Sequence, residues 1–397
     1  MKNAVLLIFV LLFCSCHGEE DYGIKPTIDG KPIAKIQMYS NKADFPMEKI
    51  NLSEFVDSVK FIRLETTEES LINNINTVFF VDDEVVIVDK MSGKILVFDN
   101  NGNYIRKIAN RGRGPGEYLG ITSCNYDNER RQLSIYDDST HKLLLYDLLG
   151  NFIKEILIDT AKSAPMRAPI RDMVNLPNGH YLCYNELISQ EAGDCSGLWE
   201  IDSDGNFVRN IFKYDITIPF VYNRYYSYFQ TLLDRTTAVR DILHNDIYYY
   251  KNGKIIKYIS WDIMDNILMN YIGQDFSEET FSYCLTIQDK NGYVIGTWID
   301  KNGQPTYFRY NKNHNKIGFA ETFDNSDIDA VWTHKVIDSN LNNALLIDLS
   351  SMSVTRMLKQ ESTPPHTKEI LNRLNAGMSE AEIEKANPII EILYLKK

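Results

Sequence analysis

The stretch ILVFDNNGNYIRKI (residues 95–108) has three further copies of the same pattern, LLLYDLLGNFIKEI (143–156), LWEIDSDGNFVRNI (198–211) and DIYYYKNGKIIKYI (246–259). Each copy is an apolar strand, a turn that ends in Gly, and a second strand rich in aromatic and aliphatic residues. Asn-Gly and Asp-Gly turns accept positive φ and are a strong local signal for a β-hairpin. The repeat therefore predicts an all-β fold.

The spacing of the repeat predicts how the strands are grouped. Its turn glycines are Gly102, Gly150, Gly205 and Gly253. Four strands with their connections need roughly 40 to 50 residues, which is the size of one blade of a β-propeller. A fifth unit is expected from Phe281 to Phe323, and a sixth begins near Val331 but stops after Leu346.

Two isolated strands complete the predicted sixth unit. VKFIRLE (Val59–Glu65) precedes the first unit and PIIEILYL (Pro388–Leu395) follows the last. Since an open sheet edge is an aggregation hazard, we expect both strands to pair in the sixth unit. The predicted fold is a six-bladed β-propeller whose N- and C-terminal strands close the last blade. A short helical insertion is expected at Thr367–Lys385, interrupted at Gly377, with Ser379 and Glu382 at the spacing of a capping box.

Composition excludes several classes of protein. The chain has 397 residues, of which 44% are hydrophobic, so it is not intrinsically disordered. Its formal net charge is −12 and no block of Lys and Arg runs along it. Binding to a nucleic-acid backbone is driven by positive charge, so a nucleic-acid partner is not expected.

The first sixteen residues, MKNAVLLIFVLLFCSC, resemble a bacterial lipoprotein signal. Lys2 is followed by an apolar run, Ala4–Phe13, that is too short to span a bilayer. The resemblance implies cleavage after residue 15 and lipidation of Cys16, with an ordinary signal peptide cut nearby as the alternative. The acidic pair Glu19-Glu20 is similar to the surface-export signal of Bacteroidetes lipoproteins.

These features predict three segments: a signal peptide (1–15), a polar spacer with three prolines (16–50) and the propeller (51–397). The expected location is the outer membrane, to which the N-terminal lipid attaches the chain. We expect the protein to face the cell surface, with the periplasm as the alternative.

The unit from Ile75 to Tyr118, in which KILVFDNNGNYIRKI is followed by NRGRGPGEY, resembles the six-bladed β-propeller lipoproteins of Bacteroidetes. These proteins are relatives of the NHL-repeat and TolB-like propellers. The likeness extends from IRLET (Ile62–Thr66) to the closing NPIIEILYLKK. It implies a fold but no activity, because most of that family has no assigned function.

Three motifs have structural interpretations. The Gly-rich segment Arg111–Tyr118 could present amides to phosphate, but it lacks the spacing of a phosphate loop and is predicted to connect two blades. Asp99–Asn103 and Asp202–Asn206 look like calcium loops, but neither has both the Gly and the Glu that such a loop requires. Both are predicted to be hairpin turns.

The segment Tyr214–Phe229 departs most from the repeat and is rich in Tyr and Arg. Exposed Tyr with Arg is typical of sugar and protein recognition. The alternative is that these rings pack between the third and fourth blades. The candidate platform residues are Tyr222, Arg224, Tyr225 and Tyr226. Candidates at the mouth of the central channel are Arg171, Asp172, Tyr228, Tyr283, Trp332 and His334.

No catalytic residues are predicted. The seven histidines form no HExxH motif and the chain has no GxSxG elbow. A metal site gathered from several blades stays open, and no cofactor is predicted. Cys183 and Cys195 are expected either to pair across neighbouring strands or to remain buried thiols.

The sequence thus predicts a non-enzymatic, lipid-anchored propeller that binds a glycan, peptide or partner protein on one face of the ring. The alternative is a calcium-dependent hydrolase or lyase similar to the six-bladed lactonases. That activity would need Glu, Asn and Asp side chains converging at the channel, and a shared fold alone does not transfer chemistry.

Overall fold

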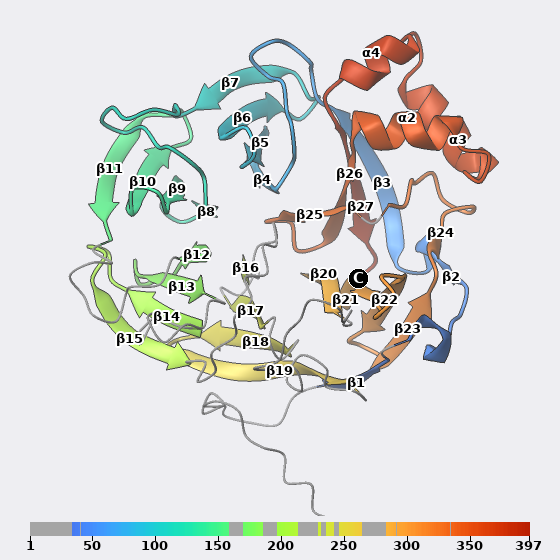
Figure 1. Ribbon diagram of the computed structural model, residues 1–397, viewed down its shortest axis with the longest axis horizontal. Coiled ribbons are helices and arrows are strands. Elements are labelled where there is room, and N and C mark those ends of the chain that lie inside the picture. The colour runs from blue at the N-terminus through green and yellow to red at the C-terminus, as the bar shows by residue number, and fades with distance from the viewer. Residues whose placement is uncertain are drawn as a thin grey trace, which may run out of the picture.

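The computed structural model describes residues 34–39, 41–158, 170–185, 197–212, 229–231, 236–241, 246–263, 283–290, 292–333 and 335–397. Their strands form sheets, which are mainly antiparallel and are arranged around a common centre (Figure 1). In each four-stranded unit one strand lies nearest this centre and the others follow outward (Figure 1). This is the arrangement of a β-propeller.

The first three four-stranded units along the chain are called sheets I, II and III. Sheet I contains β4 (Thr77–Val81), β5 (Glu84–Asp89), β6 (Lys94–Asp99) and β7 (Tyr104–Ile108). Sheet II contains β8 (Ser123–Asp127), β9 (Gln132–Asp137), β10 (Lys142–Asp147) and β11 (Phe152–Leu157). Sheet III contains β12 (Asp172–Asn175), β13 (Tyr181–Asn185), β14 (Gly197–Ile201) and β15 (Phe207–Phe212).

Two further sheets follow sheet III along the chain. Sheet IV contains β16 (Phe229–Thr231), β17 (Thr237–Asp241), β18 (Asp246–Lys251) and β19 (Lys254–Ile263), with β1 (Ala34–Met38) added at its outer edge. Sheet V contains β20 (Tyr283–Lys290), β21 (Tyr293–Ile299), β22 (Pro305–Asn311) and β23 (Lys316–Ala320).

The strands from the two ends of the chain are neighbours. β27 (Ile389–Leu395) lies between β26 (Ala344–Leu349) and β3 (Val56–Arg63), antiparallel to both. β26 also pairs with β25 (Val336–Ser339). β25 in turn pairs in parallel with β4, so these four strands and sheet I form one eight-stranded sheet.

All four predicted hairpins of the repeat are confirmed. They are β6–β7, β10–β11, β14–β15 and β18–β19. In the first three the turn Asp accepts backbone hydrogen bonds from inside its own turn. Asp99 Oδ1, for example, accepts from the amides of Asn101 at 2.8 Å and Asn103 at 2.9 Å. Asp99–Asn103 is therefore a self-contained turn, as predicted, and its hydrogen bonds from Asn103 lower the pKa of Asp99.

Gly102 shows why this turn ends in glycine. Its φ is +89°, and a Cβ at this position would lie 1.9 Å from the carbonyl oxygen of Arg63. The Gly102 carbonyl accepts a hydrogen bond from the Glu65 amide at 2.8 Å. The turn of sheet I thus rests directly on the backbone that follows β3.

The Gly-rich segment Arg111–Tyr118 connects β7 to β8, as predicted. Tyr118 is fully buried and its hydroxyl donates to the carbonyl of Gly93 at 2.9 Å. The carboxylate of Glu117 accepts from the Gly114 amide at 2.8 Å, inside the loop. These internal contacts support the structural interpretation of the segment.

The predicted spacer contains ordered structure, which corrects its boundary. β1 pairs in parallel with β19, and Ile36 and Met38 are buried in the core beside it. A 3₁₀ turn, η1 (Lys42–Asp44), follows, and Met47 then forms a bridge with Phe319 of β23. β2 (Ile50–Asn51) pairs with β24 (Phe323–Asp324), and η2 (Leu52–Glu54) leads into β3. Residues 34–39 and 41–51 therefore belong to the folded body.

The helical insertion lies between β26 and β27. α3 (Pro365–Leu374) and α4 (Glu380–Lys385) match the predicted helices, and Ser379 and Glu382 form the predicted capping box. α2 (Ser351–Lys359) was not predicted; Ser350 caps its first turn. Among the described residues, no helix is long and apolar enough to span a membrane.

The core lies between neighbouring sheets. Between sheets III and IV, for example, Leu182 and Leu198 pack with Val239 and Tyr248. The middle strands of the sheets are near-continuous apolar runs, as in β5 and β6, so both faces of a sheet are buried, which suits a propeller-like arrangement in which sheets pack face to face.

Candidate functional site

The strand order gives the ring two distinct faces. Because neighbouring strands of a sheet are antiparallel, the turns after its first and third strands lie at one side. The connections after its second and fourth strands lie at the other side. β25 and β4 are parallel, so the inner strands of these adjoining units run in the same direction. We call the first side the turn face and the second the connection face.

The two faces differ in the length of their links. On the turn face no link between the described strands is longer than five residues; 176–180 and 202–206 are examples. The long links all leave from the connection face, and include 158–171, 186–196, 213–228, 264–282 and the helical insertion. Long connections on a rigid scaffold commonly carry binding residues. The connection face is therefore the candidate functional site.

Asp172 begins β12 on this face, but its carboxylate is used within the protein. The side chain is only 3% exposed. Its Oδ1 accepts from Ser123 Oγ at 2.6 Å and from the Met173 amide at 2.9 Å. Since Ser123 belongs to β8, Asp172 joins the inner strands of sheets II and III, and these contacts favour a structural role over the predicted ligand contact.

The other described candidates lie in different surroundings. Arg171 is half-buried and its amide donates to the Tyr184 carbonyl at 2.9 Å. Trp332 packs against Phe323, with ring centroids 4.7 Å apart, and against Tyr307 at 5.7 Å. These rings belong to the core cluster beside β3 and the helices, so the described contacts do not bring Trp332 together with Asp172.

The remaining predicted residues are not described. Tyr283 is the first residue of β20, but its side chain lies outside the described set. The following residues lie wholly outside the described residues, backbone and side chain alike: Cys16, Tyr222, Arg224, Tyr225, Tyr226, Tyr228 and His334. Cys183 is buried in β13, and its possible partner Cys195 is also outside the described residues.

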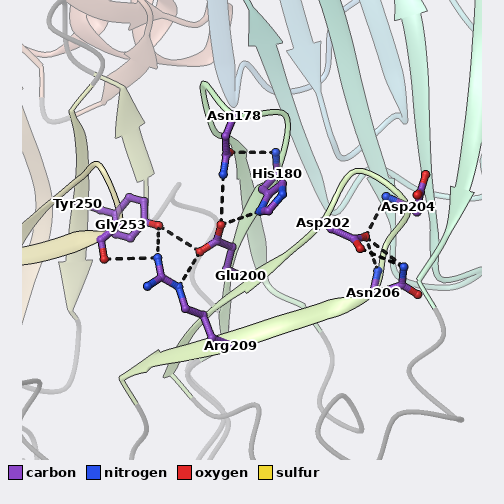
Figure 2. A network of polar contacts seen from close by, with 9 residues as sticks. All are labelled: Asn178, His180, Glu200, Asp202, Asp204, Asn206, Arg209, Tyr250 and Gly253. Carbon is purple, nitrogen blue, oxygen red and sulfur yellow. Dashed lines mark hydrogen bonds and ion pairs between the residues drawn. The ribbon is translucent and has the colours of Figure 1, made fainter.

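A polar cluster on the turn face joins sheets III and IV (Figure 2). Its centre is Glu200 of β14, whose side chain is 4% exposed. Glu200 Oε1 lies 2.7 Å from His180 Nδ1, and Oε2 accepts from Arg209 Nε at 2.9 Å. The hydroxyl of Tyr250 on β18 donates to Oε2 at 3.2 Å. Asn178 Nδ2 donates to Oε1 at 3.4 Å.

The cluster holds Glu200 in its ionised form. Burial raises the pKa of Glu200, but the hydrogen bonds from Arg209 and His180 outweigh burial, and the net pKa is lowered. A carboxylate beside an imidazole is also the arrangement of an oriented general base. Here, however, both carboxylate oxygens and the guanidinium are used for contacts inside the protein.

The repeat shows that this cluster is one copy of a contact between sheets. Arg209 stands four residues after the turn glycine and donates Nη2 to the Gly253 carbonyl in the turn of sheet IV at 3.3 Å. Arg106, at the same place in sheet I, donates Nε to the Leu148 carbonyl of sheet II at 3.1 Å. Lys154 of sheet II donates to the Ser203 carbonyl of sheet III at 3.4 Å. In sheets I, II and III the cation at this position therefore connects the sheet to the one that follows it.

Sequence reasoning missed this contact, although its signal was present. The aligned copies contain Arg106, Lys154, Arg209 and Lys257 at one position. What the sequence did not show is which carbonyl each cation would reach.

Among the described residues, no three His, Cys, Asp or Glu side chains lie close enough together to hold a metal ion.

The sequence was compared with models of known protein families. Residues 36–394 match the family described as a domain of unknown function, DUF4934. The chain belongs to the DUF4934 family. The matched range begins within β1, which agrees with a folded body that starts before residue 51. A search of curated protein sequences gives no match to this DUF4934 chain.

Solved structures share the fold of this DUF4934 protein. A protein of Bacteroides fragilis that is described as exported aligns with a TM-score of 0.70 at 14% identity, covering 92% of this chain and 100% of that one. A DUF4221 family member from Bacteroides vulgatus aligns with a TM-score of 0.51 at 10% identity, covering 86% of this chain and 97% of that one. At these identities the likeness shows the fold alone.

Proposed function

We propose that this DUF4934 protein is an exported, lipid-anchored, non-enzymatic β-propeller that binds a glycan, peptide or partner protein on its connection face. The observation that carries the proposal is the difference in link length between the two faces. On the turn face the links are short, and those after β6, β10 and β14 are held by hydrogen bonds to their own turn Asp. Long links leave only from the connection face, where inserted residues can meet a ligand without disturbing the sheets.

The proposed ring has six blades, formed by sheets I to V and by β25, β26, β27 and β3. Each unit contributes four strands. In the last unit β27 lies between β26 and β3, so this unit combines strands from early and late parts of the chain. Such a unit would close the ring in the way that a propeller needs to avoid open edges.

The proposed ligand platform is the aromatic segment between β15 and β16. Tyr222, Arg224, Tyr225 and Tyr226 lie in this link, which leaves from the connection face. Tyr rings stack on sugars and fill protein hot spots, and Arg adds hydrogen bonds and cation–π contacts.

Four single Ala variants at these positions test the platform. If the side chains face a ligand, each variant should change the free energy of unfolding by no more than about 0.5 kcal/mol. Binding found on a glycan array or by pull-down should weaken by about 1 kcal/mol or more for a central aromatic residue. If the rings are core, each Tyr variant should cost roughly 3 to 5 kcal/mol of stability.

Tyr146→Ala is the matched control for the core outcome, because Tyr146 is 2% exposed. Thermal melts that place the three platform Tyr variants with Tyr146→Ala would contradict the platform. Melts like that of the unmodified protein, with lost binding, would support it.

A further inference from the structure

Glu391, in the middle of β27, is a buried carboxyl group with few polar partners. The residue is 0% exposed. Its Oε1 accepts a hydrogen bond from the Val331 amide at 2.7 Å, whereas its Oε2 has no hydrogen-bond partner among the described residues. An ionised carboxylate away from water needs a cation or several donors, so these surroundings favour the protonated form.

In the described contacts, the neighbouring strands bring no cation to this carboxyl group. Ile347 of β26 and Phe61 of β3 lie directly opposite Glu391, on the same face of the sheet. Two residues further along β3, Arg63 lies on this face as well, but its guanidinium donates to Asn375 Oδ1 at 2.8 Å, at the end of α3. The sheet therefore surrounds Glu391 with apolar side chains, and the cation on this face is bound elsewhere.

Of the charged groups on the elements packed over this face, Asp329 acts on Glu391, and it has the same sign. Asp329 lies between β24 and β25, and together with burial it raises the pKa of Glu391. Its own carboxylate is more than half exposed and pairs with Arg373 of α3. His366 of α3 has its Nε2 3.1 Å from the Ile328 carbonyl oxygen. α3 and sheet V otherwise contribute buried side chains to this region: Thr367, Ile370, Leu371, Tyr293, Ile295 and Tyr307.

Glu391 holds part of the link between β24 and β25. We call residues 325–333 the link segment; it leads from sheet V to the inner strand β25 on the connection face. At its start, Asn325 Nδ2 donates to Thr367 Oγ1 of α3 at 3.1 Å. Further along, Ala330 and Val331 are fully buried in the core cluster beside β27. The hydrogen bond from the Val331 amide to Glu391 thus joins the buried part of the link segment to the sheet.

We propose that Glu391 is a proton-dependent latch: its protonated carboxyl group holds the link segment on β27, and its ionisation releases the segment. Once ionised, the carboxylate has one amide donor and no cation in an apolar cluster, so a state in which water reaches it becomes favoured. The release ends at Lys335, whose ammonium group pairs with Asp348 and whose carbonyl accepts from the Asp348 amide at 3.0 Å. Asp348 lies opposite Ile390, on the other face of the sheet, so this pair is separate from Glu391.

The pH interval of the release follows from the two states of Glu391. In the released state the carboxyl group is in water and titrates near its ordinary pKa, about 4.3. In the closed state burial raises its pKa well above that value. Between these two pKa values the released state binds fewer protons, so the ratio of released to closed molecules rises by up to about tenfold per pH unit. Above the closed-state pKa the ratio is constant.

Hydrogen exchange of the full chain between pH 5 and pH 9, read by mass spectrometry of its peptides, tests the latch. The natural chain is compared with Glu391→Gln, whose amide oxygen can still accept from Val331 but whose side chain does not titrate. The two chains have the same intrinsic exchange rates in the link segment, so the ratio of their rates reports opening alone. We expect this ratio to rise by up to about tenfold per pH unit in peptides from 325–333 and to stay constant in peptides of β10.

A constant ratio in the link segment would overturn the proposal. An equal rise in peptides of every sheet would mean that Glu391 acts on the whole fold, and would overturn it too. If Glu391→Gln does not fold, Asp329→Asn takes its place. Removing the like charge lowers the closed-state pKa of Glu391, so exchange of the link segment should level off at a lower pH than in the natural chain. An unchanged profile would contradict the latch. The experiment uses no ligand, so none of these outcomes bears on the proposed platform.

Discussion

Ile62 of β3 and Ile390 of β27 lie directly opposite each other in neighbouring antiparallel strands, although they come from the two ends of the folded chain. Both are almost fully buried, at 2% and 0% exposed. β27 also pairs with β26. One C-terminal strand therefore joins a late and an early segment of the sequence in one sheet.

Removing the chain from Asn387 onward should therefore cost far more than one local strand. The truncation leaves β3 and β26 without their shared neighbour and exposes two sheet edges. We expect insoluble or protease-sensitive protein, measured by solubility and limited proteolysis. A truncated chain that melts like the full chain would contradict the joint role of β3 and β27.

Gly102→Ala and Gly303→Ala should differ sharply in stability, although both glycines end turns of the same pattern. Both have positive φ, +89° and +75°, so each Ala incurs a backbone penalty of roughly 1 kcal/mol. Only Gly102 is crowded: a Cβ there meets the Arg63 carbonyl, whereas nothing lies within 4 Å at Gly303. We expect Gly102→Ala to lose about 2 kcal/mol more, by urea unfolding. Equal losses would mean that the turn does not rest on β3.

Glu391 should make the folded state less stable as the pH rises. It is fully buried on β27, its Oε1 accepts from the Val331 amide at 2.7 Å, and burial raises its pKa well above the usual value. A raised folded pKa contributes stability that is present below the unfolded pKa, about 4.3, and is lost as the pH rises through the folded pKa. Glu391→Gln keeps an acceptor for Val331, so its stability should fall less between pH 5 and pH 9.

Glu382→Gln is the control for that experiment. Hydrogen bonds from Ser379 lower the pKa of Glu382, so its contribution to stability has the opposite pH dependence and is lost as the pH falls. Urea unfolding at several pH values measures both variants. A Glu391→Gln profile parallel to that of the unmodified protein would show that Glu391 does not titrate in this way.

Cys16→Ser should release the protein into the soluble fraction of cells. Cys16 is the residue that the proposed lipoprotein signal would acylate, and no other residue would then carry the lipid. Fractionation and mass spectrometry of the mature N-terminus measure the outcome. An unmodified N-terminus downstream of Cys16 in the natural chain would contradict the anchor.

Local patterns were sufficient to predict the hairpins and the capped helix. In DNNGN the Asp carboxylate, the amides that it binds and the glycine with positive φ all lie within five residues. Ser379 and Glu382 satisfy each other within one helical turn. Such contacts form in the same way wherever the segment lies, so a single sequence contains all the information that they need.

Contacts between distant segments could not be predicted in the same way. The alternation in AKIQM is too short to distinguish β1 from a spacer, and its partner β19 lies more than two hundred residues later. Nothing in the sequence around Asp172 shows that Ser123 Oγ lies 2.6 Å from its carboxylate. The sequence likewise shows that Arg209 carries a charge, but it does not show which carboxylate Arg209 binds.

The sequence by itself determined the four hairpins of the repeat and the residues at which they turn, because turn chemistry and the apolar pattern of a strand act over a few residues. Only the tertiary structure decided which strands from opposite ends of the chain become neighbours and which charges are buried. Those outcomes depend on the packing of one sheet against the next: burial of Glu391 and pairing of Ile62 with Ile390 exist only when remote segments meet.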